Sequence, residues 1–142
     1  MLKTLLDKHG TVRMDAGETI IREGEPVDRV YILVEGEVGI FRDGDKRICS
    51  VVDAGATFGE SSFLVEGNAN ATVRTTKPSV FCAVRDPDLR DSTLLLYVAR
   101  VLARRIDRMN QLFLQACKSD NVDEDLLLES WYEKLDFDAL CR

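Results

Sequence analysis

The residues best suited to hold a ligand lie in one short stretch, from Thr57 to Val73. Gly59 lets the backbone approach a ligand closely, because glycine has no Cβ. Glu60 places a carboxylate, which only accepts hydrogen bonds, beside that bare backbone. The small and polar residues 68–71 leave the next backbone amides uncovered, as in anion-binding nests. The stretch therefore predicts a ligand cradle, or the remnant of one.

Other reactive side chains form no catalytic or metal-binding pattern. The four cysteines, Cys49, Cys82, Cys117 and Cys141, include no CxxC pair, and we expect neither a disulfide framework nor a zinc site. Cys49 and Cys82 lie in strand-like runs, where a free thiol acts as a small apolar residue. His9 is the only histidine, and no nucleophile pattern accompanies it. Without a Walker-type loop either, we expect a protein that is not an enzyme.

Composition favours a cytoplasmic protein of ordinary type. The chain has 142 residues, enough for one domain with a normal core, and 45% of them are hydrophobic. Its longest apolar run, residues 94–99, is far shorter than the roughly 20 residues of a membrane span. Residues 1–8 lack the long apolar core of a secretory signal. We therefore expect a cytoplasmic location and no membrane partner.

The net charge of −6 is concentrated at the C-terminal end. Residues 118–142 contain eight acids and three bases, which gives −5 for this segment alone. Such a chain suits the DNA backbone poorly, and the 26 residues after Ala116 are too few for a usual DNA-reading module. We expect no nucleic-acid partner. Trp131, Tyr132 and Phe137 either pack on the chain's own barrel or its dimer partner, or anchor another protein.

From Val12 to Val84 the sequence has the pattern of short strands. Runs rich in β-forming residues alternate with Gly, Pro and acidic turn residues, and Asp43-Gly44 predicts a hairpin. About eight strands over residues 12–84 favour a closed barrel or jelly roll. A short helix over residues 2–8, ended by His9-Gly10, precedes them. The predicted fold is mainly β with α: an eight-stranded jelly-roll-like β-barrel, then a long helix and a short acidic helical tail.

After Arg85 the hydrophobic period changes from 2 to 3.6, which predicts one helix over about 92–116. One apolar stripe with coiled-coil spacing favours a partner helix, and we expect a parallel homodimer. Alternatively that stripe packs on the barrel, although a second stripe is available for this contact. The expected domains are 1–117 and an acidic tail over 118–142. The predicted dimer interface consists of Leu95, Val98, Leu102, Arg105, Met109 and Leu112.

Two ordered motifs resemble the cyclic nucleotide-binding domain, the sensor domain of catabolite activator proteins and of cyclic-AMP-dependent kinase regulatory subunits. The first motif spans residues 20–36, where Gly24, the apolar residues 30–33 and the final glycine match. Val27 departs from it, because a small residue is usual there. The second motif opens with Phe58-Gly59-Glu60 and closes with Ala71-Thr72-Val73. With the long helix, the resemblance covers about residues 12–115 and implies a stand-alone sensor domain without a DNA-binding domain.

The resemblance also implies a cyclic AMP or cyclic GMP pocket. In that family the glutamate takes the ribose 2′-hydroxyl and an arginine pairs with the cyclic phosphate. Counting back from Val73 places that arginine at Ala69, and counting on from Glu60 places it at Asn70. No Lys or Arg occurs from Gly59 to Val73. The family's small helix and hinge have only residues 85–91 available here. The implied pocket residues are Phe58, Gly59, Glu60, Ser61, Ala69, Asn70, Ala71 and Thr72.

Two functions remain open on the sequence. The first is a non-enzymatic cytosolic regulatory or interaction module that has kept the fold but lost the phosphate contact, acting as a dimer and through its acidic tail. The alternative is a working sensor of cyclic AMP, cyclic GMP or another nucleotide with an atypical phosphate contact. No cofactor is expected apart from such a nucleotide.

Overall fold

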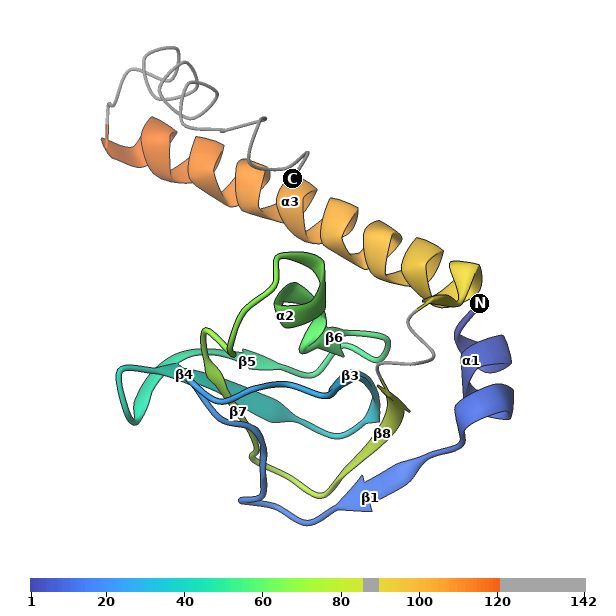
Figure 1. Cartoon of the computed structure of the whole chain (residues 1–142). Coiled ribbons are helices and arrows are strands. Elements are labelled where there is room, and N and C mark those ends of the chain that lie inside the picture. Colours follow the sequence, from blue (N-terminus) through green and yellow to red (C-terminus); the bar gives the residue numbers. More distant parts are fainter. Residues whose placement is uncertain (86–89, 121–142) are drawn as a thin grey trace. The chain divides into compact units, whose positions relative to one another are not determined.

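The computed structural model describes residues 1–85 and 90–120 of the chain (Figure 1). Contacts divide the chain into two compact units, Met1–Val101 and Leu102–Arg142. The first unit holds all the strands and the start of the last helix, and the described part of the second unit is the rest of that helix. In chain order the elements are α1 (Leu2–His9), β1 (Val12–Met14), β2 (Thr19–Ile21), β3 (Arg29–Glu35), β4 (Val38–Arg42), β5 (Lys46–Val51), β6 (Thr57–Phe58), α2 (Glu60–Leu64), β7 (Thr72–Thr75), β8 (Ser79–Arg85) and α3 (Ser92–Asp120).

The eight strands have the connectivity of a jelly roll. Sheet A has the order β1-β8-β3-β6 and sheet B the order β2-β7-β4-β5, and the pairs are antiparallel. The chain changes sheet at every connection except the β4–β5 hairpin, as in a long hairpin folded onto itself. The jelly-roll prediction is confirmed, but these ladders form two four-stranded sheets rather than one closed barrel.

A hydrophobic core lies between the two sheets. It is built from Leu33 and Phe81 of sheet A, Val38 and Val73 of sheet B, and residues Ile21, Phe58 and Ala69. Burying each of the large side chains contributes about 1.5–3 kcal/mol relative to leaving it exposed. Tyr31 meets the Phe81 ring edge-on with centroids 6.1 Å apart, and burial raises the pKa of its phenol. This core fixes the strand register on which the candidate site depends.

The opposite face of sheet A is covered by α1. Ile32 pairs with Cys82 across the β3–β8 ladder, and both side chains are fully buried. Leu5 of α1 is 1% exposed, and its carbonyl oxygen lies 3.8 Å from Cys82 Sγ. Burial raises the pKa of the Cys82 thiol, so this cysteine acts as an inert apolar residue. Cys49 differs from the expectation, because its strand lies at a sheet edge and its side chain is exposed.

The first turn of α3 is tied to the rest of its unit by specific polar contacts. Asp91 Oδ1 accepts a hydrogen bond from the Thr93 amide at 2.8 Å, as an N-cap does, and Asp91 Oδ2 lies 2.5 Å from Lys8 Nζ. The Tyr97 hydroxyl donates to the Gly55 carbonyl at 2.6 Å. Leu94 and Val98 are 0% and 3% exposed. The N-terminal part of α3 is therefore anchored on one face.

Most predicted elements are confirmed, with shifts at the boundaries. The helix predicted over 2–8 spans Leu2–His9, and the long helix begins at Ser92 as expected but continues to Asp120. The Asp43-Gly44 turn has positive φ at both residues, 50° and 85°, which matches the twist of a hairpin. The domain boundary at 117/118 stays a prediction, and most of the predicted tail lies outside the described residues.

Candidate functional site

Gly59 forms the turn between β6 and α2, and its position requires glycine. Its φ is +88°, in the left-handed region that other residues rarely adopt. A Cβ added here would lie 2.8 Å from the Arg29 carbonyl oxygen and 3.0 Å from Val27 Cγ1. The close approach predicted from the sequence is therefore present. It is made to the protein's own β3 and the segment before it.

Replacing Gly59 by alanine is expected to lower the free energy of unfolding by about 2–4 kcal/mol, from left-handed strain and overpacking together. Gly67→Ala is the matched control in the same loop region, because its Cβ would meet nothing within 4 Å and its φ is not in the left-handed region. That control is expected to change the free energy by less than about 1 kcal/mol. Urea unfolding of both variants measures the difference, and equal effects would contradict this description of the turn.

The predicted cradle residues are divided between the interior and the surface. Four are buried, two are half-buried and two are exposed. Glu60, the first residue of α2, is only 4% exposed although it carries a carboxyl group. The buried residues are Phe58, Glu60, Ala69 and Thr72; the half-buried ones are Gly59 and Ala71; the exposed ones are Ser61 and Asn70.

Hydrogen bonds join the loop before β7 to the loop after β2. The Ala69 amide donates to the Glu25 carbonyl at 2.9 Å, and the Ala69 carbonyl accepts from the Gly24 amide at 2.8 Å. Thr72 Oγ1 accepts from the Glu23 amide at 3.0 Å. These contacts hold residue 69 in a fixed orientation with its side chain 8% exposed. The Thr72 hydroxyl oxygen therefore takes part in joining these two loops.

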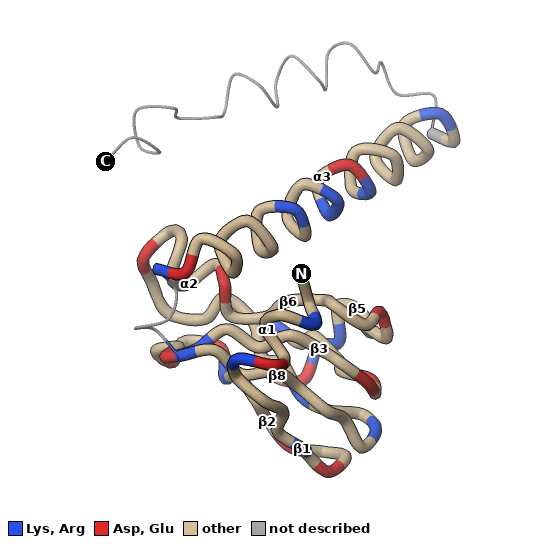
Figure 2. The backbone as a smooth tube through the Cα atoms, turned by 90° about the vertical axis from the view of Figure 1, so that its right-hand side faces the viewer, with Lys and Arg blue, Asp and Glu red and all other residues tan. Residues whose placement is uncertain are grey.

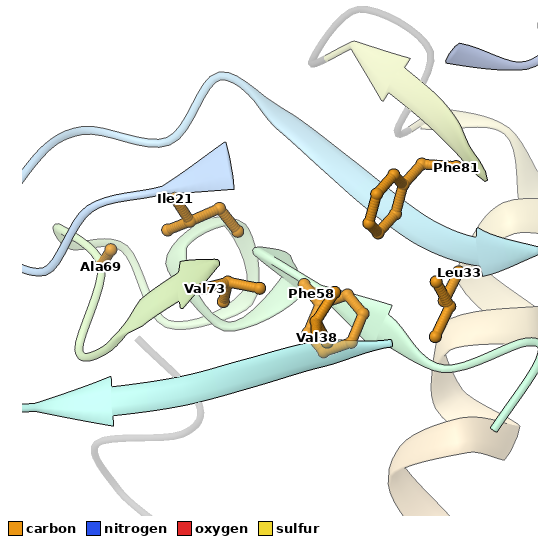
Figure 3. Close-up of a cluster of buried hydrophobic side chains, with 7 residues drawn as sticks. All are labelled: Ile21, Leu33, Val38, Phe58, Ala69, Val73 and Phe81. Atoms are coloured by element: carbon orange, nitrogen blue, oxygen red, sulfur yellow. The ribbon is translucent and has the colours of Figure 1, made fainter. Parts of the chain in front are cut away.

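Apolar side chains pack around the interior end of the cradle. Ala69 belongs to the core cluster with Ile21 and Val73, and Figure 3 shows these three together at one end of that cluster. Val27 packs against the same cluster and against Gly59. Val27 stands where the resemblance implies a small residue, so its side chain adds volume at this point. Sequence reasoning noticed Val27 but missed its contact with Gly59, which only the folded chain brings about.

A shallow hollow of about 260 Å³ lies on the outer side of the same loop. Ser61 and Asn70 line it, but none of the four buried cradle residues does. Of the eight predicted residues, this hollow brings together Ser61 and Asn70. The lining residues are Ser61, Ser62, Val65, Glu66, Gly67, Asn68 and Asn70.

The arginines flanking this region are engaged elsewhere. Arg74 lies 3.2 Å from Asp45 and its guanidinium stacks 5.0 Å from the Phe41 ring centroid. Arg29, which the sequence did not single out, binds Asp28 through two hydrogen bonds of 2.9 and 3.0 Å. The Arg29 hydrogen bond holds the pKa of the Asp28 carboxyl below its ordinary value. Both guanidinium groups are therefore paired with carboxylates outside the eight cradle residues.

The predicted dimer residues differ in their exposure along α3. Met109 and Leu112 are 67% and 56% exposed and Leu95 is 43% exposed, whereas Val98 is 3% exposed. Leu102 and Arg105 are half-buried. Basic residues recur along the helix, interrupted by Asp107 (Figure 2). Trp131, Tyr132 and Phe137 lie outside the described residues.

No group of three His, Cys, Asp or Glu side chains in residues 1–85 and 90–120 is placed to hold a metal ion. Within the same part of the chain, no helix is long and apolar enough to cross a membrane.

The described chain thus combines a jelly roll, a glycine–glutamate turn before a short helix, and a long helix after the last strand. The family model described as "Cyclic nucleotide-binding domain" matches residues 11–92, more than half of the chain. This chain belongs to the cyclic nucleotide-binding domain family, and the predicted membership is confirmed.

Individual relatives agree with this assignment. The chain is 33% identical over 107 residues to a CRP-like cAMP-activated global transcriptional regulator of Mycobacterium tuberculosis, covering 66% of this chain and 46% of that protein. It superposes on the catabolite activator protein of Thermus thermophilus with a TM-score of 0.63 and 25% identity, over 82% of this chain and 58% of that one. A regulatory subunit of a cAMP-independent protein kinase A from Trypanosoma brucei gives a TM-score of 0.60 and 25% identity, over 75% of this chain and 38% of that one. The chain spans less than half the length of the curated relatives it matches.

Proposed function

We propose that this chain is a non-enzymatic, cytoplasmic regulatory or interaction module that keeps the cyclic nucleotide-binding fold but does not recognise a cyclic phosphate through an arginine. One observation carries the proposal. Ala69, one of the two positions where the arginine is expected, is buried among apolar side chains, and Asn70, the other, is exposed on the outer hollow. Neither position holds a cation, and neither Lys nor Arg occurs from Gly59 to Val73.

Electrostatics supports the same proposal. A cyclic phosphate entering this end of the sandwich loses its hydration, and an arginine normally repays that loss with charged, two-pronged hydrogen bonds. Losing one such bond costs about 1.5–3 kcal/mol, or roughly tenfold to a hundredfold in affinity. The buried carboxyl group of Glu60 adds a like charge when it is ionised. The Val27 side chain beside Gly59 further reduces the space for a ligand.

The relatives make such a module reasonable within this family. The trypanosome regulatory subunit belongs to a protein kinase A that is cAMP-independent. The mycobacterial relative, in contrast, is cAMP-activated. Both cAMP-activated and cAMP-independent proteins therefore occur on this fold, and the absence of the arginine here favours a cAMP-independent module.

We also propose that the module is a homodimer joined through α3. Exposed and half-buried apolar residues recur on this helix at alternating steps of four and three, the spacing of a coiled-coil contact. A period of 3.5 residues favours another helix over a flat surface as the partner. This spacing keeps Leu95, Leu102 and Met109 of the predicted interface. Neighbouring residues take the place of the buried Val98, the polar Arg105 and Leu112. This α3 seam consists of Leu95, Ala99, Leu102, Ile106, Met109, Phe113 and Ala116.

The second candidate function, a sensor with an atypical phosphate contact, is favoured by the backbone of the cradle. The left-handed turn at Gly59 and the short helix α2 are both retained. Calorimetric titration with cyclic AMP and cyclic GMP separates the two candidates, because only a sensor gives a saturable signal.

The acidic segment 118–142 remains a proposed contact for a further protein. Its deletion without loss of a captured partner would argue against that role.

A further inference from the structure

Strand β5 is an unusually long exposed edge. It is the outermost strand of sheet B, and β4 is the only described strand that pairs with it. β5 has six residues, whereas the other edge strands, β1, β2 and β6, have three, three and two. An edge strand presents unpaired backbone groups to any chain that can add a strand, and natural proteins usually keep such edges short.

The exposed edge also carries apolar side chains. All residues from 42 to 50 are exposed, and Ile48 and Val52 are 54% and 59% exposed. An irregularity in the β4–β5 ladder explains the exposure of Ile48, because Cys49 pairs with Ile40 and Arg47 pairs with Phe41. Ile48 is thus the extra residue of a bulge and has no partner on β4. Exposed β-branched residues on an unpaired edge favour pairing with another strand.

The sequence of this edge is complementary to itself. In a symmetric antiparallel pair centred on Ser50, each residue after Ser50 lies opposite a residue of the second copy. That residue precedes Ser50 by the same number of positions. Centring the pair on Ser50 places Ile48 opposite Val52 of the second copy, and Arg47 opposite Asp53. Each of these pairs occurs twice, and opposite charges or apolar pairs facing one another stabilise a ladder by about 0.2–1 kcal/mol each.

The neighbouring symmetric register is less favourable. Centring the pair on Cys49 places Asp45 opposite Asp53 of the second copy, and like charges directly opposite destabilise a ladder. It also places Ile48 opposite the polar Ser50. Charge and hydrophobic matching therefore both favour the Ser50-centred register over the Cys49-centred one.

We propose that β5, extended through Val52 and Asp53, pairs antiparallel with β5 of a second copy of this chain, with Ser50 on the two-fold axis. The contact is isologous, because each copy contributes the same surface. It is small compared with a stable interface, so it forms at high concentration rather than at micromolar dilution. It is distinct from the α3 seam, and two different two-fold contacts on one chain link copies into assemblies larger than a dimer.

Cysteine cross-linking tests this register directly. Residues directly opposite in an antiparallel pair have Cα atoms about 4.5–5.5 Å apart, within the 4.4–6.8 Å range of a disulfide. In a background with Cys49, Cys117 and Cys141 replaced by serine, Ser50→Cys is expected to form a covalent dimer under mild oxidation. The control keeps Cys49 in place with Ser50 unchanged. In the proposed register two Cys49 Cα atoms are about 8 Å apart, too far for a disulfide.

Charge reversal supplies the second arm of the test. Arg47→Asp or Asp53→Arg alone is expected to lower the cross-linking yield of the Ser50→Cys variant at least about fivefold, and the double reversal is expected to restore it. Both side chains are exposed, so the fold is unaffected. The Ile106→Glu, Met109→Glu background separates this contact from the α3 seam. Equal yields at positions 49 and 50, or no rescue by the double reversal, would overturn the proposal. Pairing of β5 with a strand of another protein, but never with β5 of a second copy, would also overturn the proposal.

Discussion

Replacing Ala69 by arginine is expected to lower the free energy of unfolding by about 3–5 kcal/mol, the cost of an uncompensated charge in a packed interior. Ala69 is 8% exposed and lies in one cluster with Ile21 and Val73, so a guanidinium placed here meets packed apolar side chains. Asn70→Arg is the matched control, because Asn70 is exposed and is the other position at which the family's arginine is expected. Its effect is expected to stay within about 0.5 kcal/mol.

Urea unfolding of the two variants measures this difference in stability. A third variant tests whether crowding around residue 69 is its cause. Val27→Ala removes the side chain that packs against Gly59. Combined with Ala69→Arg, it is expected to recover part of the lost stability by making room for the guanidinium. If Ala69→Arg alone unfolds like the wild type and binds cyclic AMP tightly, the interior end of the cradle is an open pocket. The packing described around Ala69 would then be wrong.

Introducing two carboxylates into the α3 seam is expected to convert a dimer into a monomer. Ile106 and Met109 are 51% and 67% exposed in the single chain, so Ile106→Glu with Met109→Glu leaves the isolated fold intact. In the dimer both side chains would be buried, and two glutamates from each copy would meet without partners. Each buried apolar side chain contributes about 1.5–3 kcal/mol, so the dissociation constant is expected to rise at least about a hundredfold.

Light scattering at micromolar concentration measures the result. The wild type is expected at about twice the chain mass of 16.0 kDa, and the double variant at one chain mass. Gln111→Glu with Gln115→Glu adds the same two carboxylates to exposed positions away from the seam and is expected to remain dimeric. A wild type that scatters as a single chain, or a double variant that stays dimeric, would refute the seam.

The fold was predictable because its signals are local. Glycines at turns, alternating apolar strands and the change of period after Arg85 each depend on a few neighbouring residues. The count of eight strands was correct, although Val51 and Val52 do not form a strand of their own and β1 adds one before β2. The exposed Cys49 was not predictable, because its exposure depends on β5 being an edge strand.

The interior of the candidate site was less predictable because it depends on contacts between distant segments. Val27, Gly59 and Ile21 meet only after β2, β3 and β6 have assembled. The orientation of Ala69 is set by hydrogen bonds to residues 24 and 25, and nothing within residues 67–72 reveals these bonds. The exposure of the predicted dimer residues was not fully predictable for a similar reason. A periodic pattern does not say that Val98 is on the buried face of the helix.

The most direct test of the proposed function is a calorimetric titration of the wild-type chain with cyclic AMP and with cyclic GMP, each carried to 1 mM free ligand. A functional arginine contact normally supports tight binding, and its absence at residues 59–73 predicts no saturable heat with either nucleotide over this range. Saturable binding of either nucleotide within this range would contradict the account and identify the chain as a sensor.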